Sequence, residues 1–131
     1  MITNQTPQVR APYAAGLAST PHLHEGKLGK LNAAGEIELA TSADDAMGII
    51  CDPDAYITAA AGNATSATLV FLKFSGIIQV QLGSTENVTI GTKLGYAEGG
   101  VFSATESDPL AMAMENATDS VSGQMVNAIL L

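Results

Sequence analysis

Residues 67–82 read ATLVFLKF-SG-IIQVQL, and this stretch decides the fold class of the chain. Its first half, residues 67–74, is rich in the β-branched and aromatic residues that favour strands. After the Ser75-Gly76 turn signal, apolar residues alternate with glutamines, so that Ile78, Val80 and Leu82 fall on one face of a strand and the glutamines on the other. The stretch therefore predicts two strands, the second of them half-buried.

Short strand-compatible segments continue outward from this centre in both directions. Turn signals at Ala34-Gly35, Gly62-Asn63 and Glu98-Gly99-Gly100 separate several of them. One short helix is predicted over residues 54–61, because Asp52-Pro53-Asp54 suits a helix start. The fold class predicted is all-β, a small β-sandwich or β-barrel with at most one short helix. The further candidate strands are residues 36–40, 46–51, 93–97, 101–104, 110–116 and 124–131.

The chain has 131 residues, enough for one domain with a core of its own. Hydrophobic residues make up 47% of it, but aromatic residues only 5%, and there is no tryptophan. The core is therefore built from small and medium aliphatic side chains. Such a core gains from burial against a partner, so we expect the chain to oligomerise.

The charge balance excludes two classes of partner. Thirteen acidic residues stand against five cationic ones, and the cations are scattered singly along the chain. Phosphate backbones and anionic lipid surfaces attract clustered cations and repel acidic surfaces. We therefore expect no nucleic-acid and no membrane partner.

Cys51 is the single cysteine, so an intrachain disulfide is impossible. It follows Met47-Gly48-Ile49-Ile50, which favours a buried, unreactive thiol. The N-terminus lacks the cationic and apolar segments of a secretory signal, and no apolar run is long enough to span a membrane. We expect a protein that stays in the cytosol in which it is made.

Residues 1–25 differ from the rest, because three of the five prolines (Pro7, Pro12 and Pro21) occur there. Proline removes a backbone donor and restricts the preceding residue, which argues against a helix or a central strand. Residues 1–25 are therefore interpreted either as a disordered tail or as an extended N-terminal arm that orders on a partner, with residues 26–131 forming a single β domain. The candidate binding residues of the arm are Val9, Arg10, Pro12, Tyr13 and Leu17.

The sequence contains a faint internal echo. Lys27-Leu28-Gly29 recurs half a chain later as Lys93-Leu94-Gly95, and in both copies a glycine turn and further strand-like segments follow. Duplication of a three-stranded unit would explain the echo. So would chance similarity, because unrelated β segments often share the same order of strands and glycine turns.

No catalytic, cofactor or metal constellation is defensible from the residues. His22 and His24 would point the same way on an extended segment, but a metal site needs a further ligand, so they are interpreted as linker residues. The carboxylates at Asp44-Asp45 and at Asp52 and Asp54 are interpreted as turn residues. We therefore expect no cofactor and no enzymatic activity.

Four Asn-x-Ser/Thr sequences begin at Asn4, Asn63, Asn87 and Asn116. They mark glycosylation only in secreted proteins. Without a secretory signal, we interpret these asparagines as turn residues at strand ends.

The order of segments after Gly26 resembles the head decoration, or capsid cement, proteins of tailed bacteriophages. The resemblance covers about four-fifths of the chain and rests on glycine-and-strand patterns of moderate specificity. Ala113 departs from the pattern where a late glycine is expected, and the arm is longer than the pattern requires. The matching segments are residues 27–31, 46–50, 74–78, 88–94, 110–117 and 126–131.

What this resemblance implies is a non-catalytic trimer that binds the major capsid protein on the outer surface of the head, near local three-fold axes, and stabilises the shell. The virion would then be its location. One alternative is another virion or surface module, such as a tail, spike or adhesin domain that binds carbohydrate, although the few aromatic residues make a sugar platform sparse. Another is a small hydrolase that uses Asp44, Asp45 or Asp52 with His22 or His24.

Overall fold

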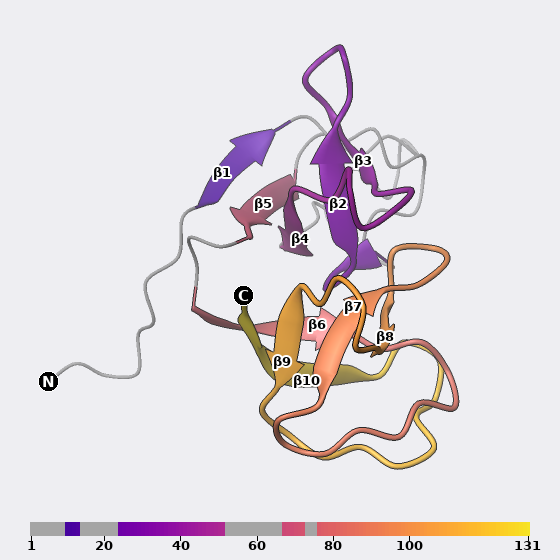
Figure 1. Ribbon diagram of the computed structural model, residues 1–131. Coiled ribbons are helices and arrows are strands. Elements are labelled where there is room, and N and C mark those ends of the chain that lie inside the picture. Colours follow the sequence, from indigo (N-terminus) through magenta and orange to yellow (C-terminus); the bar gives the residue numbers. More distant parts are fainter. Residues whose placement is uncertain (1–9, 14–23, 52–66, 73–75) are drawn as a thin grey trace, which may run out of the picture.

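The computed structural model describes residues 10–13, 24–51, 67–72 and 76–131, and it is nearly all β (Figure 1). The strands form two five-stranded antiparallel sheets, here called the first and the second sheet. The first sheet runs β1 (Arg10–Tyr13), β5 (Ala67–Phe71), β4 (Gly48–Cys51), β2 (Leu28–Leu31), β3 (Ile37–Leu39). The second runs β6 (Ile77–Gln81), β10 (Met125–Leu130), β9 (Ala111–Ala113), β7 (Lys93–Tyr96), β8 (Phe102–Ala104).

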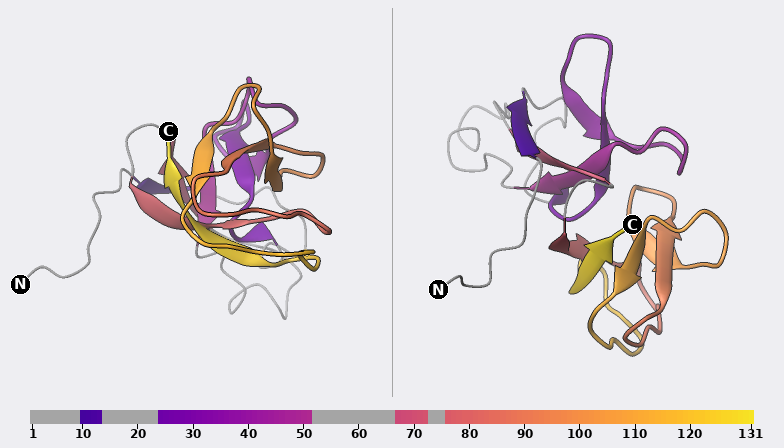
Figure 2. Two further views of the ribbon diagram at one scale, coloured as in Figure 1. Left: turned by 60° about the horizontal axis from the view of Figure 1, so that its bottom comes forward. Right: turned by 60° about the vertical axis from the view of Figure 1, so that its left-hand side comes forward.

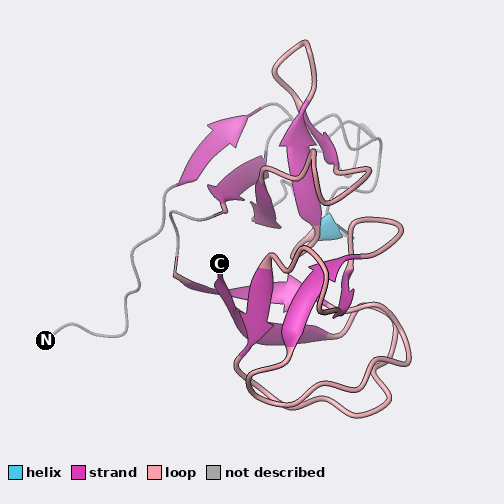
Figure 3. Ribbon diagram, in the orientation of Figure 1, coloured by secondary structure: helices cyan, strands magenta, loops and turns pink. Residues whose placement is uncertain are grey.

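The all-β prediction is confirmed, and the predicted strands lie close to the observed ones (Figure 3). In β6, Ile78 and Val80 are buried and Gln79 is exposed, as the alternation predicts. The predicted strand over residues 110–116 is too long, because β9 ends at Ala113. The helix predicted over residues 54–61 lies outside the described residues. Within the described part, no helix is long and apolar enough to cross a membrane.

The main core lies between the two sheets. It contains Leu28, Ile49 and Val70 from the first sheet together with Leu94 and Phe102 from the second, and all five side chains are 0% exposed. The opposite face of the first sheet carries a second, smaller cluster of Ile37, Ile50 and Leu69. Since the first sheet is buried on both faces, every residue of β4 is buried, including Cys51, as predicted for its thiol.

The two sheets repeat one topology. Strand order in the first sheet is the first, fifth, fourth, second and third strand of its half of the chain, and the second sheet has the same order. We call β1–β5 the first unit and β6–β10 the second unit. The right-hand view in Figure 2 shows the two units as separate layers of one sandwich. The shared strand order favours duplication as the explanation of the internal echo. The repeated unit has five strands, whereas the sequence suggested three.

The backbone hydrogen bonds align the two units one residue away from the alignment that the Lys-Leu-Gly match suggests. In the first unit, the N–H of Ala40 donates to the carbonyl of Leu28 over 2.9 Å, and in the second the N–H of Thr105 donates to that of Lys93 over 2.9 Å. Leu28 therefore corresponds to Lys93, and not to Leu94. Because neighbouring strand residues face opposite ways, this shift changes which side chains are equivalent.

Backbone hydrogen bonds also join the two sheets and close the second one. Gly26 donates to the carbonyl of Ile50 and accepts from the N–H of Gln81, both over 2.8 Å. Leu82, directly after β6, forms a parallel bridge with Phe102 of β8, so the second sheet curls until its two outer strands meet. The described sheets are therefore a continuous hydrogen-bonded framework.

Candidate docking surfaces

The predicted arm contributes a strand to the fold. Arg10, Pro12 and Tyr13 lie in β1, which pairs with β5 at an edge of the first sheet. An edge is where a proline is tolerated, since its missing N–H can face away from the neighbouring strand. Val9 and Leu17 lie outside the described residues. The assignment of these five residues to partner binding stays a prediction.

His24 and Glu25 lie where the chain enters the first sheet. The Nζ of Lys27 is 3.3 Å from Nδ1 of His24, and partial burial lowers the pKa of the Lys27 ammonium. An open groove beside this segment is lined by Lys27, Gln79 and Met125, among others. His22, Asp52 and Asp54 lie outside the described residues. In the described part of the chain, no group of three or more His, Cys, Asp or Glu side chains could hold a metal ion.

Asp45 organises a turn between β3 and β4. Its carboxylate accepts hydrogen bonds from the N–H groups of Thr41 and Ser42, both over 3.0 Å, and from the Thr41 hydroxyl. The Nζ of Lys30 lies 3.2 Å from its Oδ2. The Thr41 hydroxyl first, then the N–H groups and Lys30, hold the pKa of the Asp45 carboxyl well below its usual range. This is the turn role that the sequence predicts for Asp45.

Asp45→Asn is expected to lower the free energy of unfolding at neutral pH by about 1 kcal/mol, because the amide is a weaker acceptor. The folded-state pKa is depressed, so the stabilisation is complete above the unfolded pKa and is lost as the pH falls toward the folded one. The difference between variant and parent should therefore shrink below about pH 4. Urea unfolding at several pH values measures it, with Asp44→Asn, the exposed neighbour, as control. A pH-independent difference would contradict this role of Asp45.

Two long loops, residues 83–92 and 114–124, are bound together beyond the second sheet and run side by side in Figure 1. The hydroxyl of Ser120, which is 2% exposed, donates to the carbonyl of Gly83 over 2.6 Å and accepts from the N–H of Glu86 over 2.8 Å. Asn87 and Asn116 accept backbone N–H groups across the same pair of loops. These two asparagines lie in loops, but their side chains join the two loops and do not make the local turn contacts that the sequence suggested. Asn4 and Asn63 lie outside the described residues.

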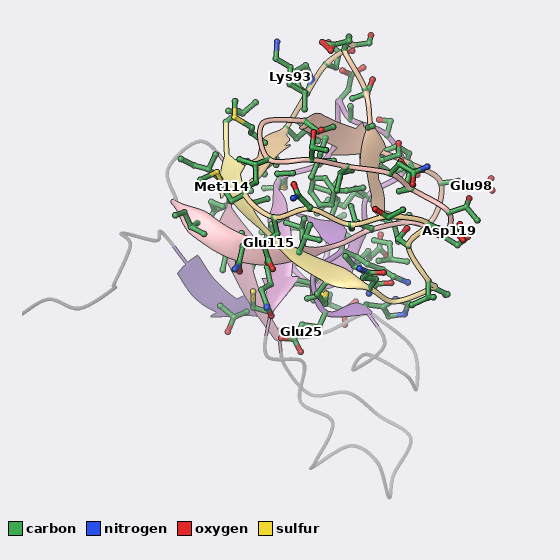
Figure 4. All side chains as sticks on the ribbon, turned by 90° about the horizontal axis from the view of Figure 1, so that it is seen from below. Glu25, Lys93, Glu98, Met114, Glu115 and Asp119 are labelled. Carbon is green, nitrogen blue, oxygen red and sulfur yellow. The ribbon has the colours of Figure 1, made fainter. Side chains whose placement is uncertain are left out.

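The second sheet has an apolar outer face, directed away from the first sheet. Because β9 and β10 alternate between buried and less buried residues, Met112 and Ile129 point outward with Ile77 of β6. Met114 and Leu131 continue the same alternation and are 38% and 42% exposed. We call Ile77, Met112, Met114, Ile129 and Leu131 the outer face. Figure 4 views the molecule from the side that lies at the bottom of Figure 1, with Met114 and Lys93 labelled.

Comparison with solved structures gives a likeness of fold. No protein-family model matches the chain, and no curated protein matches it. Among solved structures, the chain is similar to the N base of head fiber gp8.5 in bacteriophage phi29, with a TM-score of 0.59 and 19% sequence identity. The match covers 95% of this chain and 95% of that chain.

The two chains share a fold. At this sequence identity the likeness establishes architecture, and it extends over nearly the whole of both chains, so both units of the present chain are included. The sequence resemblance to head decoration proteins and the likeness to a head fiber base are separate observations.

Sequence reasoning did not single out the outer face. The alternation in β6 already places Ile77 on the side of Gln79, but Met112 and Ile129 come from strands far away in the sequence. Only the register of β6, β10 and β9 brings these three side chains into one row. The Lys-Leu-Gly repeat is a sequence signal that relates the two units, but it aligns them one residue away from the alignment given by the backbone hydrogen bonds.

Proposed function

We propose that this chain is a structural protein of a bacteriophage head that binds the outside of the shell through the major capsid protein and stabilises it. The observation that carries the proposal is the likeness, over nearly the full length of both chains, to the base of a phage head fiber. The sequence resemblance to capsid cement proteins supports the same location. The acidic charge balance favours a protein partner over nucleic acid.

The proposed mechanism is linkage between binding and shell stability. A ligand that binds the assembled shell better than its separated subunits shifts the equilibrium toward the assembled state. A head offers many equivalent sites, so a small stabilisation at each site adds up. If the chain is a trimer, three symmetry-related contacts also act together, and each of them can be weak.

The N-terminal strand is the proposed contact with the shell. Among the described strands, β1 is the last of the first sheet and has β5 on one side, so its other edge is a position at which a further strand or loop can hydrogen-bond. Arg10 and Tyr13 are the residues of this strand with the largest polar and aromatic side chains. Residues 1–9 precede the strand and include the candidate Val9.

Sedimentation with purified heads that lack the chain tests the proposal. The unmodified protein should co-sediment with the heads. Heads that carry the protein should release their genome at a higher temperature than bare heads. The double variant Arg10→Ala/Tyr13→Ala is expected to bind heads at least about tenfold more weakly. This corresponds to a loss of roughly 1.4 kcal/mol in binding free energy.

The matched control is Ile90→Ala/Val121→Ala, two substitutions on the paired loops at side chains that are 64% and 67% exposed. This control should bind heads as the parent does. Equal binding of the β1 variant would show that β1 is not the contact. Failure of the unmodified protein to bind heads would overturn the proposed function.

A further inference from the structure

The first unit buries one cross-strand row of side chains between the sheets. Leu28, Ile49 and Val70 are directly opposite one another on β2, β4 and β5. All three are 0% exposed and belong to the core shared with the second sheet. In this row, an apolar sheet face from the other unit is what excludes water.

The second unit carries the equivalent row on its outer face. Lys93, Met112, Ile129 and Ile77 are opposite one another on β7, β9, β10 and β6. Lys93 takes the place of Leu28, Met112 that of Ile49, and Ile129 that of Val70. Met112 and Ile129 are half-buried and Ile77 is 38% exposed, so this row is covered far less than its counterpart.

The outer face is more apolar than a solvent-facing sheet surface needs to be. In a sheet with one wet face, the outward positions are normally polar, as Gln79 is on β6. Here Ile77, Met112 and Ile129 form a row, and Met114 and Leu131 flank it on the same face. Contiguous exposed apolar surface of this kind marks an interaction site.

We propose that the outer face of the second sheet binds a second copy of this chain. The molecule itself shows what covers the equivalent row, namely the apolar face of another five-stranded unit. In a second copy, the described sheet face that is not already buried is this same outer face, so the two copies would pack with their outer faces together. The single cation of the row, Lys93, lies at its end, where an acidic copy of the chain can approach it. The inference deepens the proposed function by assigning a surface to self-association, and it is tested without heads.

Sedimentation equilibrium of the full chain at micromolar concentration is the test. The unmodified protein should sediment as an oligomer, with a mass clearly above the 13.4 kDa of one chain. Met112→Lys places a charge in the middle of the row, and burying it unpaired is expected to raise the dissociation constant between copies by about 100-fold. Ile77→Lys, at a more exposed position of the same row, is also expected to weaken association. Because this position is less buried, a loss of association in this variant cannot be attributed to misfolding caused by the Met112 substitution.

Val121→Lys is the matched control, because it adds the same charge at an apolar side chain that is 67% exposed and lies on the paired loops. It should keep the mass of the parent. A monomeric parent, or an oligomer unchanged in both row variants, would overturn the inference. A monomeric parent whose head binding is lost on Met112→Lys would instead assign the outer face to the capsid, leaving the proposed function in place.

Discussion

Phe102→Ala is expected to lower the free energy of unfolding by about 3–5 kcal/mol, the range for removing a fully buried aromatic ring. Phe102 is 0% exposed and lies in the core shared by the two sheets. Its backbone also forms the parallel bridge with Leu82 that closes the second sheet. The ring therefore fills the interior at the point where β8 and the end of β6 meet.

Urea unfolding followed by circular dichroism measures this loss. Ile90→Ala removes a similar kind of apolar surface from a side chain that is 64% exposed, and should change the free energy of unfolding by no more than about 0.5 kcal/mol. A Phe102→Ala variant as stable as the parent would show that the interior of the second unit is not packed as described.

Gly48→Ala is expected to cost about 3 kcal/mol, because a methyl group at this position has no space. A Cβ on Gly48 would lie 2.5 Å from the carbonyl oxygen of Val70 and 3.0 Å from Cγ of Leu69. The closest atom belongs to the backbone of the neighbouring strand β5, so relief requires β4 and β5 to move apart. That movement would disturb both clusters that the first sheet buries.

Gly83→Ala is the matched control for Gly48→Ala. The nearest atom to a Cβ at Gly83 is Cγ2 of Val101, at 3.4 Å, which is ordinary contact. The control should stay within about 0.5 kcal/mol of the parent. Equal stability of the two glycine variants, measured by thermal unfolding, would contradict the close pairing of β4 with β5.

The sequence predicts most of the strands because their signals are local. The alternation from Ile78 to Leu82 and the glycine turns at Gly35 and Gly99-Gly100 require no knowledge of distant residues. Strand ends are less accurate, as β9 shows by ending at Ala113, because the ends depend on which partner continues the ladder. The place of β1 beside β5 depends likewise on a distant strand.

The candidate surfaces are harder to predict for the same reason. The row of the outer face joins β6, β10 and β9, and its register is set by backbone pairing across half the chain. The Lys-Leu-Gly echo suggests that Leu28 and Leu94 are equivalent, whereas the hydrogen bonds make Lys93 the counterpart of Leu28. A shift of one residue in a strand exchanges its two faces. The sequence match pairs two buried leucines, whereas the backbone alignment pairs the buried Leu28 with the exposed Lys93, and only the second alignment relates the outer face to a buried row.

The two proposals assign different surfaces of the chain to different contacts. The edge strand β1 is assigned to the shell, and the outer face of the second sheet is assigned to another copy of the chain. These surfaces belong to different units, so one protein can use both at once. An assembly that is joined through one surface and bound through the other gains affinity from the number of its contacts.

Cryo-electron microscopy of purified heads with and without the chain tests the proposed function most directly. We expect additional density of the size of this fold on the outside of the shell, present only when the chain is supplied. Identical maps of the two samples, or additional density confined to the tail, would contradict it.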